Sequence, residues 1–152
     1  GQAEEIGRSL AGRARTLRRA GRRAALISGG EPVVRLAPVE RRGKGGRNQQ
    51  LVLAALLDAR GDERSWDHIA LLSGGTDGED GPTDAAGAFV DAEVARAVCR
   101  QQLDAAGALS RNDAYEFLKP LGALLRTGPT HTNVCDLRIV VVDGSEPMSG
   151  PD

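Results

Sequence analysis

The stretch HIALLSGGTDGEDGPTDAAGA, residues 68–88, joins an apolar run to a loop rich in glycine and aspartate. The run over 69–73 has the length and composition of a buried β-strand that ends at a glycine pair. The loop that follows carries Asp77, Asp80 and Asp84. In open α/β sheets, ligands collect in loops at the carboxyl ends of strands. This stretch therefore predicts an α/β fold with part of a ligand site after the strand.

Segments of strand and helix length alternate along the rest of the chain. The expected helices span 3–20, 47–59, 92–103 and 114–118, with Asp91 as an N-cap, and the expected strands span 24–28, 33–37, 69–73, 86–90, 124–127 and 136–142. Strands that alternate with helices favour a layered α/β architecture. We predict a three-layer α/β/α fold with a mixed, mainly parallel sheet and helices on both faces.

Composition limits the function classes. A chain of 152 residues with a formal net charge of −1 fits one domain, and no long basic block predicts a nucleic-acid partner. No apolar run reaches the length of a transmembrane helix, so no membrane association is expected. Cys99 and Cys135 have neither CxxC spacing nor the number needed for a disulfide framework. A soluble protein of the reducing cytoplasm is the simplest expectation.

The two ends of the sequence indicate whether it is part of a longer protein. The chain opens on Gly1, and its single methionine is Met148. We therefore expect a piece of a longer protein, with one domain over 1–143. The segment 144–152 is rich in proline, serine and glycine, and we expect it to be a disordered tail.

Three polar loops follow predicted strands, over Ser28–Glu31, Ser73–Asp77 and Thr127–Asn133. If these strands end at one edge of the sheet, the loops converge there. Convergence of these loops is the main indication of function that the residues themselves provide.

Gly45 and Gly46 precede Arg47 and Asn48 at the start of the predicted 47–59 helix. Glycine lets backbone N–H groups approach a ligand closely, and a helix N-terminus favours an anion. The segment is either an anion-binding loop with a guanidinium attached or a glycine turn with a surface arginine. It is not a Walker loop, because no serine or threonine follows Lys44, and no dinucleotide-type GxGxxG follows a strand.

The three aspartates raise the question of a metal. Counted from Asp77, a calcium loop would need glycine where Pro82 stands and glutamate where Ala88 stands, so that template fails. Mg²⁺ held by one or two carboxylates and a substrate phosphate is compatible with the spacing. Alternatively, Asp80 or Asp84 caps a helix begun near Pro82, and Asp77 closes an Asx turn.

Five segments, taken together and in order, resemble the MOFRL domain, the C-terminal domain of the glycerate 2-kinases. They are Ser28–Glu31, Gly45–Gln49, Gly75–Gly87, Asn112–Tyr115 and Thr127–Val134. The resemblance runs from the first helix to about residue 142. It implies ATP-dependent phosphorylation of D-glycerate to 2-phosphoglycerate, with Mg²⁺, in a cleft shared with an N-terminal Rossmann-like domain.

The resemblance also implies roles for particular residues. By motif, Arg47, Asp77 and Asp80 are expected to be catalytic, and Asp77 and Asp80 are the candidate metal ligands. Expected contacts to substrate or phosphate come from Gly29, Gly30, Glu31, Gly46, Asn48, Asp84, Thr130, Thr132 and Asn133.

Three positions depart from the family pattern. His131 stands where glycine is usual, Gln50 where glutamate is common, and Pro32 where threonine often follows the glycines and glutamate. A side chain at His131 alters the expected shape of the third loop. Two other functions stay open: an NADH-dependent hydroxypyruvate reductase domain, and a binding module of the same fold without catalysis.

Overall fold

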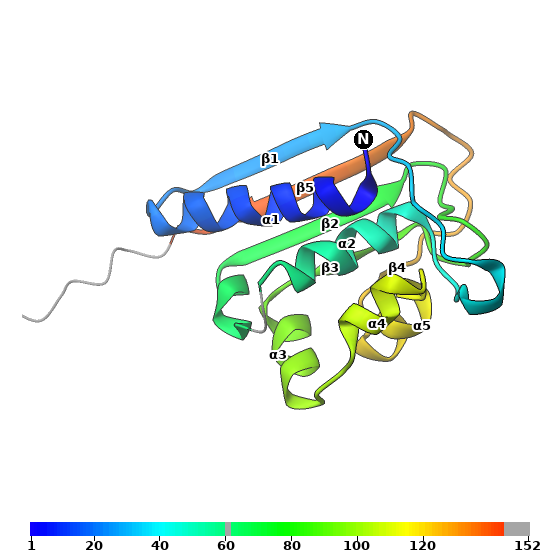
Figure 1. Cartoon of the computed structure of the whole chain (residues 1–152). Helices are drawn as coiled ribbons and strands as arrows, with labels where there is room; N and C mark the ends of the chain where they lie inside the picture. The colour runs from blue at the N-terminus through cyan, green and yellow to red at the C-terminus, as the bar shows by residue number, and fades with distance from the viewer. Residues whose placement is uncertain (60–61, 145–152) are drawn as a thin grey trace, which may run out of the picture.

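The computed structural model describes residues 1–59 and 62–144. Its framework is a five-stranded sheet in the order β1-β5-β2-β3-β4. Helices α1 (Ala3–Arg19) and α2 (Arg47–Leu57) lie side by side across one face of it (Figure 1). The strands are β1 (Ala24–Gly29), β2 (Ile69–Gly75), β3 (Gly87–Val90), β4 (Leu124–Leu125) and β5 (Asp136–Val142).

Shorter helices complete the described part of the chain. They are α3 (Ala92–Arg100), α4 (Ala105–Ser110), α5 (Ala114–Leu118) and the 3₁₀ helices η1 (Val39–Arg41), η2 (Glu63–Trp66) and η3 (Lys119–Leu121). Asp91 caps α3 as expected, since its carboxylate accepts a hydrogen bond from the Val94 N–H at 2.9 Å. Within 1–59 and 62–144, no helix is long and apolar enough to cross a membrane.

Most elements predicted from periodicity are confirmed, but one predicted strand is wrong and one helix was not predicted. The predicted strand over 33–37 is wrong, because Val33 makes only an isolated bridge with Gln2. Helix α4 was missed because it is short and has a glycine at its centre. Of the predicted tail, residues 145–152 lie outside the described residues.

The α/β class is confirmed, but the predicted strand directions are wrong. Every neighbouring pair in the sheet is antiparallel. Strands β1 and β2 do run the same way, with α2 in the connection between them, but β5 inserts between the two and pairs with both. The second layer of helices, expected on the other face, is not found among residues 1–59 and 62–144 (Figure 1).

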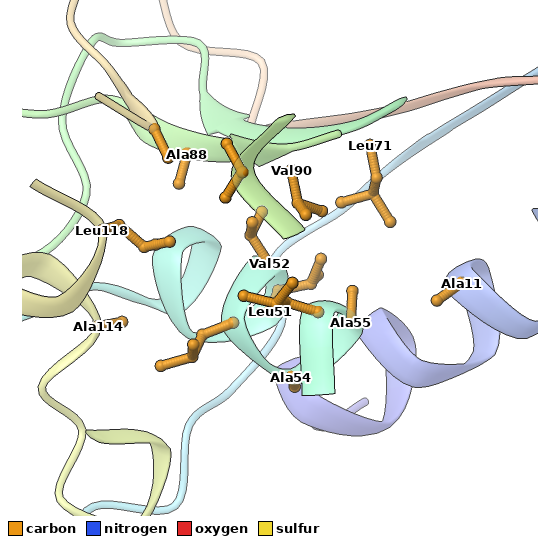
Figure 2. Close-up of a cluster of buried hydrophobic side chains, with 14 of the residues drawn as sticks. Ala11, Leu51, Val52, Ala54, Ala55, Leu71, Ala88, Val90, Ala114 and Leu118 are labelled. Atoms are coloured by element: carbon orange, nitrogen blue, oxygen red, sulfur yellow. The ribbon is translucent and has the colours of Figure 1, made fainter. Parts of the chain in front are cut away.

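Helix α2 forms the centre of the core (Figure 2). It is apolar almost all round, as expected for a helix buried on every side. Its Leu51, Val52, Ala54 and Ala55 are fully buried. They lie between strand residues on one side and residues of α1 and α5 on the other, including Leu71, Ala88, Val90, Ala11, Ala114 and Leu118.

The approach of α1 to α2 depends on Gly7. A Cβ atom built on Gly7 would overlap the backbone carbonyl of Leu51 and press on the Ala55 backbone nitrogen. Gly12, one and a half turns further along the same helix, has open space in the equivalent direction. The two glycines of α1 therefore test packing and helix propensity separately.

Replacing these glycines should shift stability in opposite directions. Gly7→Ala should lower the free energy of unfolding by about 1–3 kcal/mol, because α1 must move away from α2. Gly12→Ala should raise it by about 0.5–1 kcal/mol, because alanine loses less backbone entropy in a helix. Urea unfolding measures both values, and equal effects at the two sites would contradict the close packing.

Candidate functional site

The three polar loops converge at one edge of the sheet, as predicted. The carboxyl ends of β1, β2 and β4 point to this edge, together with the start of β5 (Figure 1). Convergence was predicted correctly although the sheet is antiparallel, because β1, β2 and β4, which carry the loops, run in the same direction. Each loop is then tied to its neighbours by hydrogen bonds.

Backbone contacts join the loops near the start of β5. The Gly30 N–H donates to the Asp136 carbonyl at 3.2 Å, and the Thr76 N–H donates to the Cys135 carbonyl at 3.1 Å. The Thr130 N–H donates to the Asp77 carbonyl at 3.1 Å. First, second and third loops therefore form one continuous surface.

Arg47 is held at this edge by two carboxylates. Its Nε and Nη2 donate to the two oxygens of Asp136 at 2.7 and 2.9 Å, a bidentate pair. Nη2 also lies 3.1 Å from Glu31 Oε1. The Asp136 side chain is completely buried, whereas that of Arg47 is 32% exposed. The guanidinium is thus fixed on its protein side and open to solvent on the other.

The hydrogen bonding that Arg47 donates to Asp136 is the largest contribution that raises the pKa of Arg47, and the charge of Glu31 adds to it. Arg47 is therefore a permanent cation. Asp136 was not among the candidate site residues. Its only sequence signal is a carboxylate that opens an apolar strand.

Asp80 is buried and caps α2 from a distant part of the chain. Its Oδ1 accepts from the Asn48 N–H at 3.0 Å, and its Oδ2 accepts from the Gln49 N–H at 2.9 Å. Oδ1 also accepts from Asn48 Nδ2 at 3.2 Å. A Cβ on Gly46, the N-cap residue, would overlap Asp80, so this position needs glycine. Both oxygens of Asp80 are occupied by the protein.

The expected ligand Asn48 is buried with Asp80 rather than open to a substrate. Its Oδ1 accepts a hydrogen bond from Ser73 Oγ at 2.5 Å, which links α2 to β2. Gln50 is also buried, and its Nε2 donates to the Leu109 carbonyl at 2.9 Å and to Glu4 at 3.1 Å. The first turn of α2 is therefore a polar network inside the domain.

Asp77 faces the third loop. Its Oδ1 accepts from the Glu79 N–H at 3.1 Å, the Asx turn considered from sequence, and its Oδ2 accepts from Asn133 Nδ2 at 3.1 Å. Thr130 Oγ1 donates to the carbonyl of Thr76 and lies 3.3 Å from the carbonyl of Thr132. Asp77 is partly buried, whereas Asp80 and Asp136 are buried.

His131 has a φ of +58°, in the left-handed region that favours glycine. The backbone thus keeps the conformation suited to glycine, and the exposed imidazole is added to the outside of the loop. Gly78, in the second loop, packs so closely on the Gly128 carbonyl that a Cβ there would overlap it.

Asp84 belongs to a separate group. Its Oδ1 accepts from Tyr115 Oη at 2.7 Å, and its Oδ2 accepts from Arg126 Nε at 3.1 Å. The Tyr115 hydroxyl and then Arg126 hold the pKa of Asp84 below its ordinary value. Lys44 Nζ lies 4.4 Å from the centre of the Tyr115 ring. Tyr115 ends one of the five segments that resemble the family, but no pattern in the sequence linked it to Asp84 or Arg126.

The three aspartates of the second loop thus have three different partners: the third loop, the start of α2, and Tyr115. Residues 1–59 and 62–144 contain no group of three or more His, Cys, Asp or Glu side chains that could hold a metal. A Mg²⁺ ion that keeps its waters needs fewer protein ligands. Asp77 is the carboxylate that fits such a role better than Asp80, because Asp77 is partly exposed whereas Asp80 is buried against the start of α2.

A cavity of about 440 Å³ opens beside the start of α2. Its lining includes Gly46 and Arg47, Gly81 and Pro82 of the second loop, and Val33. Arg47 therefore borders open space. Arg47 is partly exposed and is bound to the buried carboxylate of Asp136, and loops that contain glycine and a cavity adjoin it. These features define the class, an α/β domain suited to a small anionic ligand.

Comparisons with known proteins agree with this class. The model of the MOFRL family matches residues 24–136, and the chain belongs to that family. A D-glycerate 2-kinase of Thermotoga maritima is 50% identical over 119 residues, which cover 78% of this chain and 27% of that protein. A protein of Agrobacterium vitis named "Putative hydroxypyruvate reductase" is 38% identical over 146 residues, 93% of this chain and 37% of that protein.

A crystal structure of a glycerate kinase from Thermotoga maritima superposes with a TM-score of 0.81 at 42% identity. The match covers 93% of this chain and 33% of that one. The chain therefore spans about a quarter to a third of the length of these kinase relatives, and it retains their fold over nearly all of its own length.

Because Asp80 is buried, the stability of the protein should depend on pH in a testable way. Burial raises the pKa of Asp80 to about 6, although the N–H groups of Asn48 and Gln49 act in the opposite direction. An unfolded aspartate titrates near 3.9. Between these values the folded state binds more protons than the unfolded state, so this group should lower the free energy of unfolding as pH rises from about 4 to about 6.

Carbon-13 NMR of the Asp80 carboxyl group should show a midpoint near 6. In urea unfolding across that pH range, Asp80→Asn should no longer show this fall in the free energy of unfolding. Asp104→Asn is the control: it removes an exposed cap carboxylate on α4 and should still show the fall. A midpoint at or below 4 would contradict the dominance of burial.

Proposed function

We propose that this chain is the C-terminal domain of an ATP-dependent glycerate 2-kinase. The remaining polypeptide would form an N-terminal Rossmann-like domain, and D-glycerate and ATP would react in a cleft between the two. Membership in the MOFRL family and the kinase relatives support this function. The cysteine spacing, which builds no disulfide framework, supports the cytoplasm as the compartment.

The observation that carries the proposal is the orientation of Arg47. Asp136 fixes the guanidinium by a bidentate pair, so its solvent side faces the loop edge without further ordering cost. Phosphoryl transfer depends mainly on positioning and on neutralisation of the charge that develops on phosphate oxygens. A fixed, permanent cation beside a cavity suits this requirement.

The reaction joins the 2-hydroxyl oxygen of glycerate to the γ-phosphorus of ATP and breaks the bond between that phosphorus and the bridging oxygen, which leaves with ADP. The hydroxyl proton needs an acceptor, and Asp77 is the accessible carboxylate that we assign to that step or to Mg²⁺. Mg²⁺ would supply charge neutralisation on the phosphates. Thr132 and the second hydrogen on Asn133 Nδ2 would donate hydrogen bonds to the substrate. Thr130 would hold the third loop in place, because its hydroxyl already donates to the Thr76 carbonyl. The backbone at Gly29 and Gly30 would allow close approach of the substrate.

Three expected catalytic or binding residues receive other roles in this proposal. Asp80 positions Arg47 by anchoring the start of α2, because both of its oxygens are used there. Asp84 holds Tyr115 and Arg126 rather than the substrate. Glu31 limits the freedom of Arg47 from the solvent side and would separate from it when an anion binds.

The shared cleft predicts that this chain alone has little kinase activity. Turnover of D-glycerate and ATP should be measured for the 152-residue chain and for the full-length product of its reading frame, under the same conditions. Only the longer protein should convert substrate at a rate typical of an enzyme. Comparable turnover by the short chain would refute the shared cleft.

In the full-length protein, Arg47→Ala should lower kcat/KM by tenfold or more, a loss of about 1.4 kcal/mol or more in transition-state stabilisation. Arg47→Lys should recover little, because an ammonium cannot reproduce the bidentate geometry. Arg8→Ala is the control, since Arg8 is exposed on α1 and pairs there with Glu4. An unchanged kcat/KM in Arg47→Ala would remove this residue from the site.

The relative named for hydroxypyruvate reduction gives the alternative activity a direct assay. Loss of NADH absorbance with hydroxypyruvate, in the absence of ATP-dependent phosphorylation of glycerate, would replace the kinase proposal with the reductase. Absence of both activities in the full-length protein would favour a binding module.

A further inference from the structure

The face of the sheet opposite to α1 and α2 is apolar. We call it the open face. It consists of Ala25, Ile27, Ala70, Leu72, Phe89, Leu137, Ile139 and Val141, which alternate along their strands with residues of the helix-covered face.

The strand register makes the open face continuous. Ile27 pairs with Ile139, Ile139 pairs with Leu72, and Leu72 pairs with Phe89, so one apolar row crosses four strands. A second row runs from Ala25 through Val141 to Ala70. Residues directly opposite each other on one face of a sheet are in side-chain contact range.

Much of this surface is exposed to solvent in the 152-residue chain. Ile27 is 69% exposed, Val141 48% and Leu137 37%. An antiparallel sheet with one face in water normally carries polar side chains on that face. Strand β5 instead carries Leu137, Ile139 and Val141 outward, a composition typical of a strand that is buried on both sides. The sheet thus has the sequence of a middle layer, but among residues 1–59 and 62–144 helices cover only one of its faces.

We infer that the open face is an interface, and that it is buried by the part of the full-length polypeptide that lies outside these 152 residues. The solved glycerate kinase matches 93% of this chain, but the match covers only 33% of that structure, so about two thirds of its polypeptide is available to supply a cover. Large exposed apolar surfaces mark interaction sites in soluble proteins.

This interface is distinct from the loop edge. The shared cleft of the proposed function needs contacts at Arg47 and the three loops, whereas the open face lies on the flat side of the sheet. The inference shares with the proposed function only the requirement for a longer polypeptide. A labelling experiment that does not depend on activity therefore separates the two.

The test is the accessibility of single cysteines introduced as Ile27→Cys and Val141→Cys. Thr16→Cys is the control, because Thr16 is exposed on α1, on the helical side of the domain. Each variant is prepared in the 152-residue chain and in the full-length protein and treated with a maleimide. Labelling is read at each position by peptide mass spectrometry, so the native cysteines stay in place, and circular dichroism checks folding.

Positions 27 and 141 should react in the 152-residue chain and at least tenfold more slowly in the full-length protein, while position 16 reacts at similar rates in both. Equal reactivity of positions 27 and 141 in the two proteins would overturn the inference. Protection in the 152-residue chain itself, rising with its concentration and accompanied by dimers in sedimentation, would also overturn it, because a second copy would then be the cover. If one variant fails to fold, the other still decides between these outcomes.

Discussion

Helix α2 begins inside the protein, where the N–H groups of its first turn need acceptors that water does not supply. The carboxylate of Asp80 provides them, although it lies 32 residues further along the chain than Asn48. This contact fixes the second loop against the helix, and the Asn48 side chain carries the connection on to Ser73 of β2. Arg47 stands on the first turn of α2, so the direction of its guanidinium is set by the same network. The stability of the domain and the geometry of its site thus depend on one buried carboxylate.

The positions of most helices and strands could be predicted from the sequence. The order and direction in which the strands pair could not. The apolar run over 51–57 predicts a central helix, and the strands around 24–28, 69–73 and 136–142 were found from composition. The position of β5 between β1 and β2 was not foreseen, because a continuous apolar strand can pair in either direction. The loops converge nonetheless, since insertion of β5 leaves the directions of β1 and β2 unchanged.

The same limit applies to the site. Arg47 is recognisable because it follows two glycines at a helix start, and the structure places it at the loop edge. The partnership with Asp136 depends on where the last strand inserts, which local spacing does not encode. Asp77, Asp80 and Asp84 share a short segment but have different partners in space. Gly78 and Gly81, which lie on either side of Asp80 and have positive φ, let the backbone turn between the three aspartates. The sequence analysis therefore treated these three aspartates as one candidate site, whereas the structure separates them.

The insertion of β5 also affects how the domain is made. Ala24, at the start of β1, pairs with Val142 at the end of the last strand, so nearly the whole described chain separates two partners in the sheet. Until residues 136–142 leave the ribosome, β1 and β2 have no strand between them and the three loops have no common anchor. Pairing over such a separation carries the entropic cost of closing a long loop and slows folding. The loop edge is thus among the last parts of the domain to form, and β1 must remain unpaired during synthesis until β5 arrives, whereas β2 can already pair with β3.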